Sequence, residues 1–421
     1  MHIDLNKYFF AVRNRFYSGD YNNVFFCLNN ESCDLDSFTS SILLSIFLDK
    51  TPKFVRQNFV VSSNQKKGNL FVPIFNLKQK HFKIRKDLTF YVEKMSIDKN
   101  NLIFVDDFYF KNIQNKNFFI CLVDHNRLSH KQRHLFKDVV FVIDHHFDEC
   151  ALGSNHKIIE KAGSCATLIF DLISKNNKNL FQNIVATEST NLLLSSTIFI
   201  DTNNFNPLLK NNFSSKDVNY FNILTKFHTT NLDIRKNFIE KMAKMKDDYG
   251  NLTNYEILRK DRKTINFNVK KIELNVSISS IKSLFSKNIL DEMAKNLKKK
   301  NLKIKSCESI CKRIIFSVAM FINYENLAKK ENSQNCSQKL NLKRQLLICG
   351  EKTKFWNFGK TEKFLNCLNE IDKNCYFVKA NFSEFDFDEN IVFVLLEQKN
   401  VSYSRKKIIF ILKKAFSDFF D

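Results

Sequence analysis

The sequence predicts an α/β protein of two domains, the first built on a parallel sheet with helices on both faces. Its 421 residues exceed the roughly 100 to 200 typical of one domain. Short runs of Val, Ile, Leu and Phe alternate with segments of helical length, as in a parallel sheet whose strands are covered on both sides. Hydrophobic residues make up 44% and charged residues 26%, which excludes a disordered or fibrous chain.

The expected strands of the first domain are apolar runs that each end in polar residues. In chain order they are NVFFCLN, NLIFVDD, FFICLVDHN, VVFVIDHH and STIFIDTNN. Ligands of open α/β sheets bind beyond the carboxyl ends of the strands. The acids and histidines at these ends are therefore candidates for a functional site.

From about Phe205 the pattern changes to Lys- and Asn-rich helical stretches, at about 216–228 and 232–248. We expect residues 1–210 to form the first domain, 211–235 linking helices, and 236–421 the second domain. Four strand-like runs follow: KIELNVSISS, RIIFSVAMFI, RQLLICG and ENIVFVLLE. With the helical segments DEMAKNLKKK and SRKKIIFILKKAF, they predict a second, smaller α/β domain.

The formal net charge of +22, most of it in residues 211–421, favours a polyanionic partner such as nucleic acid, a phosphate polymer or anionic lipid. The 11 cysteines contain no CxxC pair; this argues against a disulfide framework or zinc ribbon and favours a reducing, cytoplasmic location. The first residues lack a signal-peptide pattern, and no run approaches 18 apolar residues. A soluble protein without membrane association is expected.

The segment CDLDS follows the first expected strand. Asp34 and Asp36 flank Leu35 at the turn into a helix, so both carboxylates can enter one crevice. Paired carboxylates suit Mg²⁺ or Mn²⁺. The alternative interpretation is an acidic cap of the helix.

Further candidates end the later strands: Asp124, then Asp144 with His145 and His146, then Asp201 at a fourth strand end. Neighbouring histidines after a buried strand point in different directions, so one can bind metal while the other faces a substrate oxyanion. Taken singly, each is also compatible with a supporting or surface role. Together, one set is suited to two divalent cations about 3.5 to 4 Å apart that activate a bridging water and neutralise a phosphoryl group: Asp34, Asp36, Asp124, His145 and Asp201.

The segments CDLDS, LVDHN, VIDHH and IDTNN, in this order and spacing, resemble the DHH phosphoesterase superfamily. NESCDLDS, FVPIFNLKQKHFKIRKDLTF, FVDD and GSCATLIFDLI resemble its exopolyphosphatase and Prune branch, and most of all the cytosolic exopolyphosphatases of eukaryotes. LRKDRK and SRKK extend the resemblance to about Lys407. It implies a DHH domain followed by a DHHA2 domain that closes over the cleft.

The resemblance also implies metal-binding roles. Asp34 would bind one cation and Asp36 the other, Asp124 would bridge them, and His145 and Asp201 would complete the second site. The cations implied are Mn²⁺ or Mg²⁺, with Co²⁺ as a further option.

The resemblance places other residues on the substrate. His146 would face its phosphate, and His125 and Asn126 would support the site, with His125 also close to substrate. In the second domain Lys263, Arg405 and Lys406 would grip phosphate oxygens, since Arg offers a planar fork and Lys a point charge. Asp124, His145, His146 and Arg405 are the residues expected to be catalytic.

Asn30 stands where related pyrophosphatases have a histidine. The missing imidazole implies a weaker first metal site and argues against a dedicated pyrophosphatase. The function implied is a metal-dependent exopolyphosphatase that hydrolyses the terminal phosphoanhydride of inorganic polyphosphate and releases orthophosphate. No stable nucleic-acid partner is expected, and the sequence does not distinguish a monomer from a homodimer.

Two alternatives remain open. One is a Prune-like short-chain polyphosphatase or cyclic nucleotide phosphodiesterase, because the metal motifs are shared. The other is a catalytically inactive regulatory protein that binds phosphate polymers.

Overall fold

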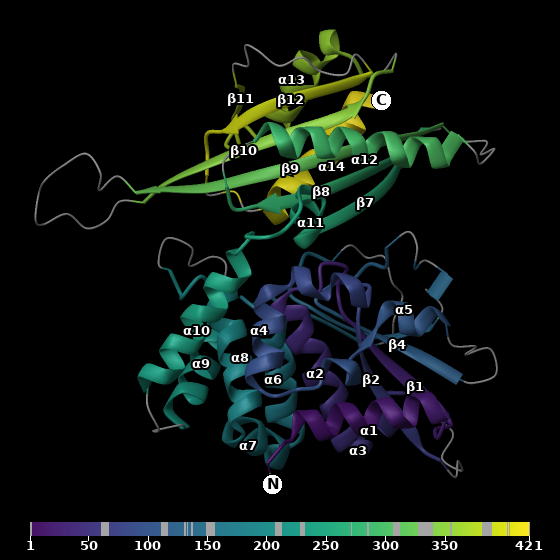
Figure 1. Cartoon of the computed structure of the whole chain (residues 1–421), viewed down its shortest axis with the longest axis vertical. Coiled ribbons are helices and arrows are strands. Elements are labelled where there is room, and N and C mark those ends of the chain that lie inside the picture. Colours follow the sequence, from purple (N-terminus) through teal and green to yellow (C-terminus); the bar gives the residue numbers. More distant parts are fainter. Residues whose placement is uncertain are drawn as a thin grey trace, which may run out of the picture. The chain divides into compact units, whose positions relative to one another are not determined.

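The computed structural model divides the chain into two compact units, Met1–Asp248 and Tyr249–Asp421 (Figure 1). It describes residues 2–59, 67–110, 117–129, 132, 134–135, 138–148, 156–206, 213–227, 232–270, 272–283, 286–305, 312–326, 340–353, 356–380, 390–401, 403 and 405–420.

A six-stranded sheet forms the centre of the first unit, and every pair of neighbouring strands in it is parallel. The strands are β1 (Asn23–Leu28), β2 (Asn69–Phe75), β3 (Ile103–Phe104), β4 (Asn117–Val123), β5 (Val139–Asp144) and β6 (His156–Ile159). Their order is β3-β2-β1-β4-β5-β6. Strands β2 and β3 lie on one side of β1, and β4, β5 and β6 lie on its other side, so the strand order reverses between β1 and β4. In such a sheet the reversal opens a crevice beyond the carboxyl ends of the two central strands.

Ten helices of the described chain belong to this unit. They are α1 (Leu5–Ser18), α2 (Leu35–Lys50), α3 (Pro52–Asn58), α4 (Lys86–Lys94), α5 (Val105–Phe110), α6 (Cys165–Asn176), α7 (Lys178–Ala186), α8 (Glu188–Asp201), α9 (Ser215–Phe227) and α10 (Leu232–Asp247), with short 3₁₀ turns at Gln79–Ile84 and Lys99–Asn101. Side chains of α2, α6 and α8 pack on one face of the sheet. Val12 and Phe16 of α1 pack on the other face together with Leu128 and Leu135. The expectation of a parallel sheet covered on both faces is confirmed.

Helix α2 holds the first acidic motif rigidly in the core. Its residues from Leu35 to Leu48 are all buried, as is typical of a helix that is surrounded by other elements. Asp34 is its N-cap and accepts a hydrogen bond from the backbone N–H of Ser37. The first turn of α2, which contains Asp36, therefore has little freedom to move.

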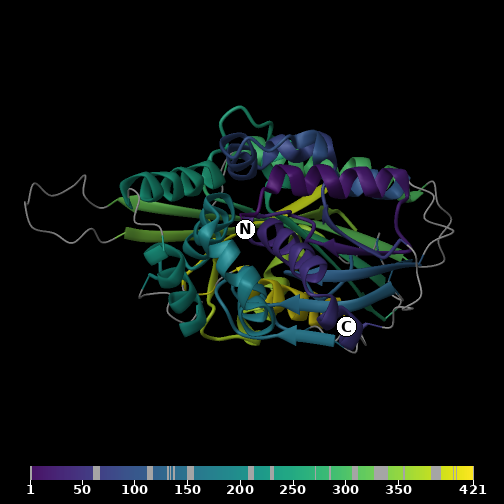
Figure 2. The ribbon, with the colours of Figure 1, turned by 90° about the horizontal axis from the view of Figure 1, so that it is seen from below.

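The prediction of a strand at STIFIDTNN is wrong, because residues 196–201 form the last part of α8, which ends at Asp201. Ile198 is buried and Phe199 and Ile200 are partly buried, and a short apolar run does not distinguish a buried strand from a buried helix. Helices α9 and α10 pack against α8 (Figures 1 and 2). The structure divides the chain after Asp248, so α10 lies with the first unit, whereas the sequence-based division assigns residues from 236 to the second.

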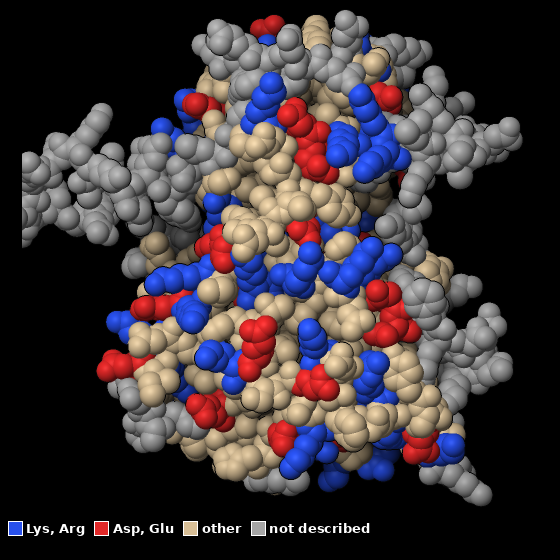
Figure 3. Space-filling model, viewed as in Figure 1, with Lys and Arg blue, Asp and Glu red and all other residues tan. Residues whose placement is uncertain are grey.

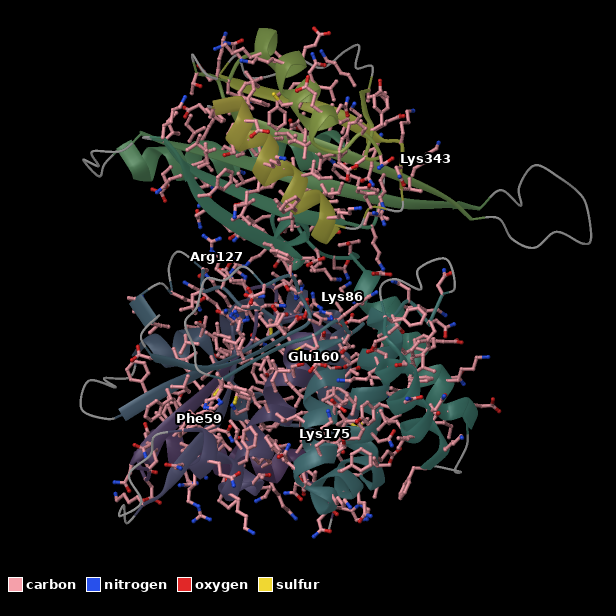
Figure 4. The ribbon with its side chains drawn as sticks, turned by 180° about the vertical axis from the view of Figure 1, so that it is seen from behind. Phe59, Lys86, Arg127, Glu160, Lys175 and Lys343 are labelled. Carbon is pink, nitrogen blue, oxygen red and sulfur yellow. The ribbon has the colours of Figure 1, made fainter. Side chains whose placement is uncertain are left out.

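The second unit contains a six-stranded mixed sheet in the order β11-β12-β10-β9-β8-β7, in which β8 and β9 are parallel and the other neighbours antiparallel. Its strands are β7 (Arg262–Val269), β8 (Ile272–Ile281), β9 (Lys312–Asn326), β10 (Leu340–Glu351), β11 (Phe377–Lys379) and β12 (Ile391–Gln398). The helices are α11 (Asn254–Lys260), α12 (Lys287–Lys305), α13 (Thr361–Ile371) and α14 (Arg405–Phe420), with a 3₁₀ turn at Phe358–Lys360. Helix α12 covers one face and α13 with α14 the other (Figures 1 and 4). The expected second α/β domain is confirmed.

The surface carries both signs of charge. On the face shown in Figure 3, Lys and Arg side chains are interspersed with Asp and Glu. Among the helices that the structure describes, none combines the length and apolar composition needed to cross a membrane.

We expect Gly350→Ala to destabilise the second unit. A methyl group at Gly350 would lie 2.7 Å from Phe316 Cε1 and 3.0 Å from Trp356 Nε1, and both rings are completely buried. Overpacking of this kind costs about 1–3 kcal/mol. Gly359→Ala is the matched control, because its nearest contact is Asn357 Oδ1 at 3.5 Å. Urea unfolding measures both variants, and equal stabilities would contradict the packing argument.

Candidate metal centre

The candidate site lies at the carboxyl edge of the first sheet, around its two central strands. Asp34 and Asp36 follow β1, Asp124 follows β4, and Asp144 ends β5 directly before His145. Because β1 pairs with β4 and β4 with β5, the parallel register brings these strand ends to one place. Figure 4 labels Arg127, just after β4, and Lys86 at the same end of the unit, while Phe59 and Lys175 lie toward the other end.

Asp124 is at the centre of the cluster. Its carboxylate accepts a 2.7 Å hydrogen bond from Asn30 Nδ2 and lies 3.2 Å from His145 Nε2 and 3.4 Å from His146 Nδ1. The residue is almost fully buried, and its φ of 58° is left-handed. A residue other than glycine in this left-handed conformation carries backbone strain on the order of 1 kcal/mol. The surrounding packing therefore holds the Asp124 carboxylate in the crevice in spite of this strain.

His145 has the tautomer and orientation of a metal ligand. Its Nδ1 lies 3.0 Å from the carbonyl oxygen of Ala162, so Nδ1 carries the proton and donates it. The lone pair of Nε2 then points to the carboxylates, 3.2 Å from Asp124 Oδ1 and 3.7 Å from Asp36 Oδ2. Histidine ligands of metals typically donate their other ring N–H to a carbonyl or carboxylate oxygen, as His145 does to Ala162.

His146 is positioned by Asp144, a role that the sequence did not assign. Asp144 Oδ1 accepts from His146 Nδ1 at 2.7 Å and from the backbone N–H of both histidines, while Oδ2 accepts from Asn126 Nδ2 at 2.7 Å. Burial opposes ionisation, but the charge and hydrogen bonds of His146 outweigh it and lower the pKa of Asp144 below its usual value. Asp144 thus remains charged and turns Nε2 of His146 away from itself.

Asp36 joins the site to helix α6. Its carboxylate accepts hydrogen bonds from Ser164 Oγ at 2.7 Å and from the backbone N–H groups of Cys165 at 2.7 Å and Ala166 at 2.9 Å. It therefore caps α6 from another helix. Burial, with the negative charges of Asp124 and Asp201, raises the pKa of Asp36 well above its usual value.

Asp34 reaches Asp124 through Asn30, whose Nδ2 lies 3.4 Å from both oxygens of Asp34 and 2.7 Å from Asp124. Asn30 Oδ1 in turn accepts from Ser32. His125 lies beside this group, with Nδ1 2.9 Å from the carbonyl oxygen of Val123.

Asp201 approaches from the C-terminal end of α8, and its partner is Lys246 of α10. Lys246 Nζ is 3.0 Å from Asp201 Oδ1. Burial disfavours the ammonium, but the charges of Asp201, Asp34 and Asp87 outweigh it and raise the pKa of Lys246. Sequence reasoning missed Lys246, because a lysine in a Lys-rich helix carries no distinguishing signal.

The donor set fits divalent metal ions. Ligand atoms of Asp124, Asp144, His145 and His146 all lie within 4.8 Å of one another. Carboxylate oxygens with imidazole nitrogen suit Mg²⁺ or Mn²⁺. Burial and, after it, the negative charges of Asp124 and Asp201 raise the pKa of Asp36, and cations would relieve that repulsion. Of the expected ligands, Asp124 and His145 belong to this group, and Asp36 Oδ2 lies 3.7 Å from His145 Nε2. Asp34 is linked to Asp124 through Asn30, whereas Asp201 pairs with Lys246.

The substrate-binding residues expected in the second unit lie in strand β7 and at the start of helix α14. Lys263 is the second residue of β7 and half-buried. Arg405 begins α14, as the sequence predicts. The side chains of Arg405 and Lys406 lie outside the described residues, so their expected contacts with phosphate stay predictions.

Two family models match this chain. The N-terminal domain of the DHH family matches residues 25–197, and the DHHA2 domain matches residues 240–415. The curated relatives include exopolyphosphatase PRUNE1 of Bos taurus, 30% identical over 250 residues, and of Homo sapiens, 31% identical over 245 residues. The chain belongs to the DHH family, in its exopolyphosphatase and Prune branch.

The extent of these similarities is limited. The matches cover 59% and 56% of this chain and 51% and 49% of the two relatives, so the chain spans about half the length of the curated relatives it matches. The crystal structure of a Methanococcus jannaschii protein described as "putative family II inorganic pyrophosphatase" has a TM-score of 0.50 and 19% identity, over 93% of this chain and 98% of that one. That likeness concerns the fold.

We expect stabilisation by divalent cations to grow with pH. The raised pKa of Asp36 means that its protonation favours the metal-free fold, so its unfavourable contribution is largest above that pKa and fades as pH falls toward the ordinary 3.8. A bound cation relieves this repulsion only where Asp36 is charged. The measurement is the melting temperature with MnCl₂ minus the melting temperature with EDTA, taken at each pH of a series. A difference that is constant with pH would contradict the assignment of Asp36.

Proposed function

We propose that the chain is a metal-dependent exopolyphosphatase that hydrolyses the terminal phosphoanhydride of inorganic polyphosphate and releases orthophosphate. The observation that carries the proposal is the buried group of Asp36, Asp124 and His145 at the crevice of the DHH domain, with Nε2 of His145 directed at both carboxylates. The named activity of the PRUNE1 relatives supports this substrate class.

The proposed ligands are those expected from the sequence: Asp34, Asp36, Asp124, His145 and Asp201. Bound there, two cations, Mn²⁺ or Mg²⁺, would supply an activated water and neutralise the phosphoryl charge. The side chains of the protein orient these parts. Asp124 lies between Asn30 and His145, and this central place supports the proposal that it would hold the cations.

His146 is the proposed contact to the phosphoryl oxygens. Asp144 accepts from its Nδ1–H, and in the protonated ring Nε2–H would donate to a developing negative charge. His125 is a further candidate on this side. Lys263, Arg405 and Lys406 are proposed to bind the remaining phosphate chain from the DHHA2 domain.

A cytoplasmic location accompanies this proposal. Seven cysteines lie in the described part of the chain, and all seven have free thiols, as expected in a reducing compartment. Inorganic polyphosphate is the proposed partner.

We expect Asp124→Asn to reduce orthophosphate release at least about 100-fold, because the neutral amide removes the central negative charge of the site. The assay uses purified protein with polyphosphate and MnCl₂. Asp20→Asn, at an exposed residue, is the matched control and is expected to keep full activity. An Asp124→Asn protein that is folded by circular dichroism and retains activity would refute the assignment of the site.

A substrate panel separates the Prune-like alternative, a short-chain polyphosphatase or cyclic nucleotide phosphodiesterase, from the leading proposal. We expect release of orthophosphate from long-chain polyphosphate to exceed that from tripolyphosphate, pyrophosphate or cyclic AMP. Preference for a short chain or for cyclic AMP selects the alternative. Binding of polyphosphate without turnover, with Mn²⁺, Mg²⁺ or Co²⁺, identifies an inactive binding protein.

A further inference from the structure

We propose that Lys246 is an internal counter-ion that occupies Asp201 in the metal-free protein and leaves it when a divalent cation binds. Asp87 is the acceptor to which the displaced ammonium turns. This inference rests on the proposed metal site, but it concerns a residue outside the expected ligand set.

The contact itself is close. Lys246 is in the last turn of α10, with Nζ 3.0 Å from Asp201 Oδ1, and the two side chains are 27% and 17% exposed. Asp201 acts electrostatically on Asp36, and Asp34 acts on Lys246. The ammonium therefore lies among the same carboxylates that the cations would use. A metal ion and an ammonium cannot both take the same Asp201 oxygen.

Asp87 provides the second position. Its side chain is completely buried, and Oδ2 pairs with Arg85 Nη2 at 2.8 Å. Its other oxygen, Oδ1, makes no hydrogen bond within the described part of the chain. A buried carboxylate oxygen without a donor is costly, and Asp87 already acts electrostatically on Lys246. The flexible stem of lysine allows Nζ to move without its backbone.

Contacts along α4 hold the backbone of α10 while the lysine moves. Lys86 Nζ pairs with Asp248 Oδ2 at 2.8 Å, at the end of the unit seen in Figure 4. About two turns earlier on α10, Lys241 Nζ lies 5.2 Å from the centre of the Phe90 ring. The expected change is thus a shift of one side chain.

Competition of this kind weakens metal binding, because the apparent Kd equals the intrinsic Kd divided by the fraction of molecules in which Asp201 is free. Lys246→Met removes the ammonium but keeps an unbranched side chain. We expect it to tighten Mn²⁺ binding about fivefold or more, the lower end of typical coupling between sites. Lys246→Arg keeps the charge and is expected to bind Mn²⁺ within about twofold of the original protein. Lys244→Met, on the exposed side of the same helix, is the matched control and is expected to change nothing.

The measurement is Mn²⁺ binding to the full chain by isothermal titration calorimetry, without substrate. Tighter binding by Lys246→Met alone supports the proposal, since a merely structural role would weaken binding or leave it unchanged. Equal or weaker binding, or no binding by either protein, overturns it. Asp87→Asn in a double-mutant cycle tests the second acceptor: it should weaken binding when Lys246 is present and have no effect beside Lys246→Met. An equal effect in both backgrounds removes Asp87 from the proposal.

This experiment is independent of turnover. If Lys246→Met binds Mn²⁺ more tightly but no substrate of the panel is hydrolysed, the counter-ion proposal stands and the proposed function fails. If hydrolysis occurs but the affinities are equal, the reverse holds.

Discussion

Repulsion between carboxylates at the end of a parallel sheet is the constraint around which the first unit is arranged. Burial raises the pKa of Asp36, and the negative charges of Asp124 and Asp201 raise it further, because like charges in a buried crevice are only weakly screened. The neighbouring groups each offset part of this repulsion. Asn30 donates to Asp124, the start of α6 donates to Asp36, and Lys246 donates to Asp201.

Much of this site could be predicted from the sequence, because strand direction alone brings chain-distant residues together. Asp124 and His145 follow apolar runs that the structure shows to be β4 and β5, and parallel pairing places their ends side by side. The prediction of Asp201 rests on the wrong local structure. Asp201 ends a buried helix, whose apolar composition resembles that of a buried strand.

The roles of Asp144 and Lys246 could not be found in this way. The role of Asp144 depends on hydrogen bonds to the histidines that follow it, and a sequence pattern does not distinguish such a residue from a ligand. Lys246 and Asp87 belong to helices that meet only through tertiary packing. The division after Asp248 also depends on packing, since α10 has the same Lys-rich character as the segments that follow it.

Asp36 has a consequence for how such a site can change over generations. Its oxygens accept hydrogen bonds from the first turn of α6, so replacing Asp36 removes a helix cap from the core as well as a negative charge. Asp201 lies at a helix end, where its described partner is Lys246, and its replacement removes no helix cap from the core. A lineage that abandons catalysis is therefore expected to lose Asp201 early and to keep Asp36 long after its chemistry is gone, so an intact CDLDS segment is weak proof of a working enzyme.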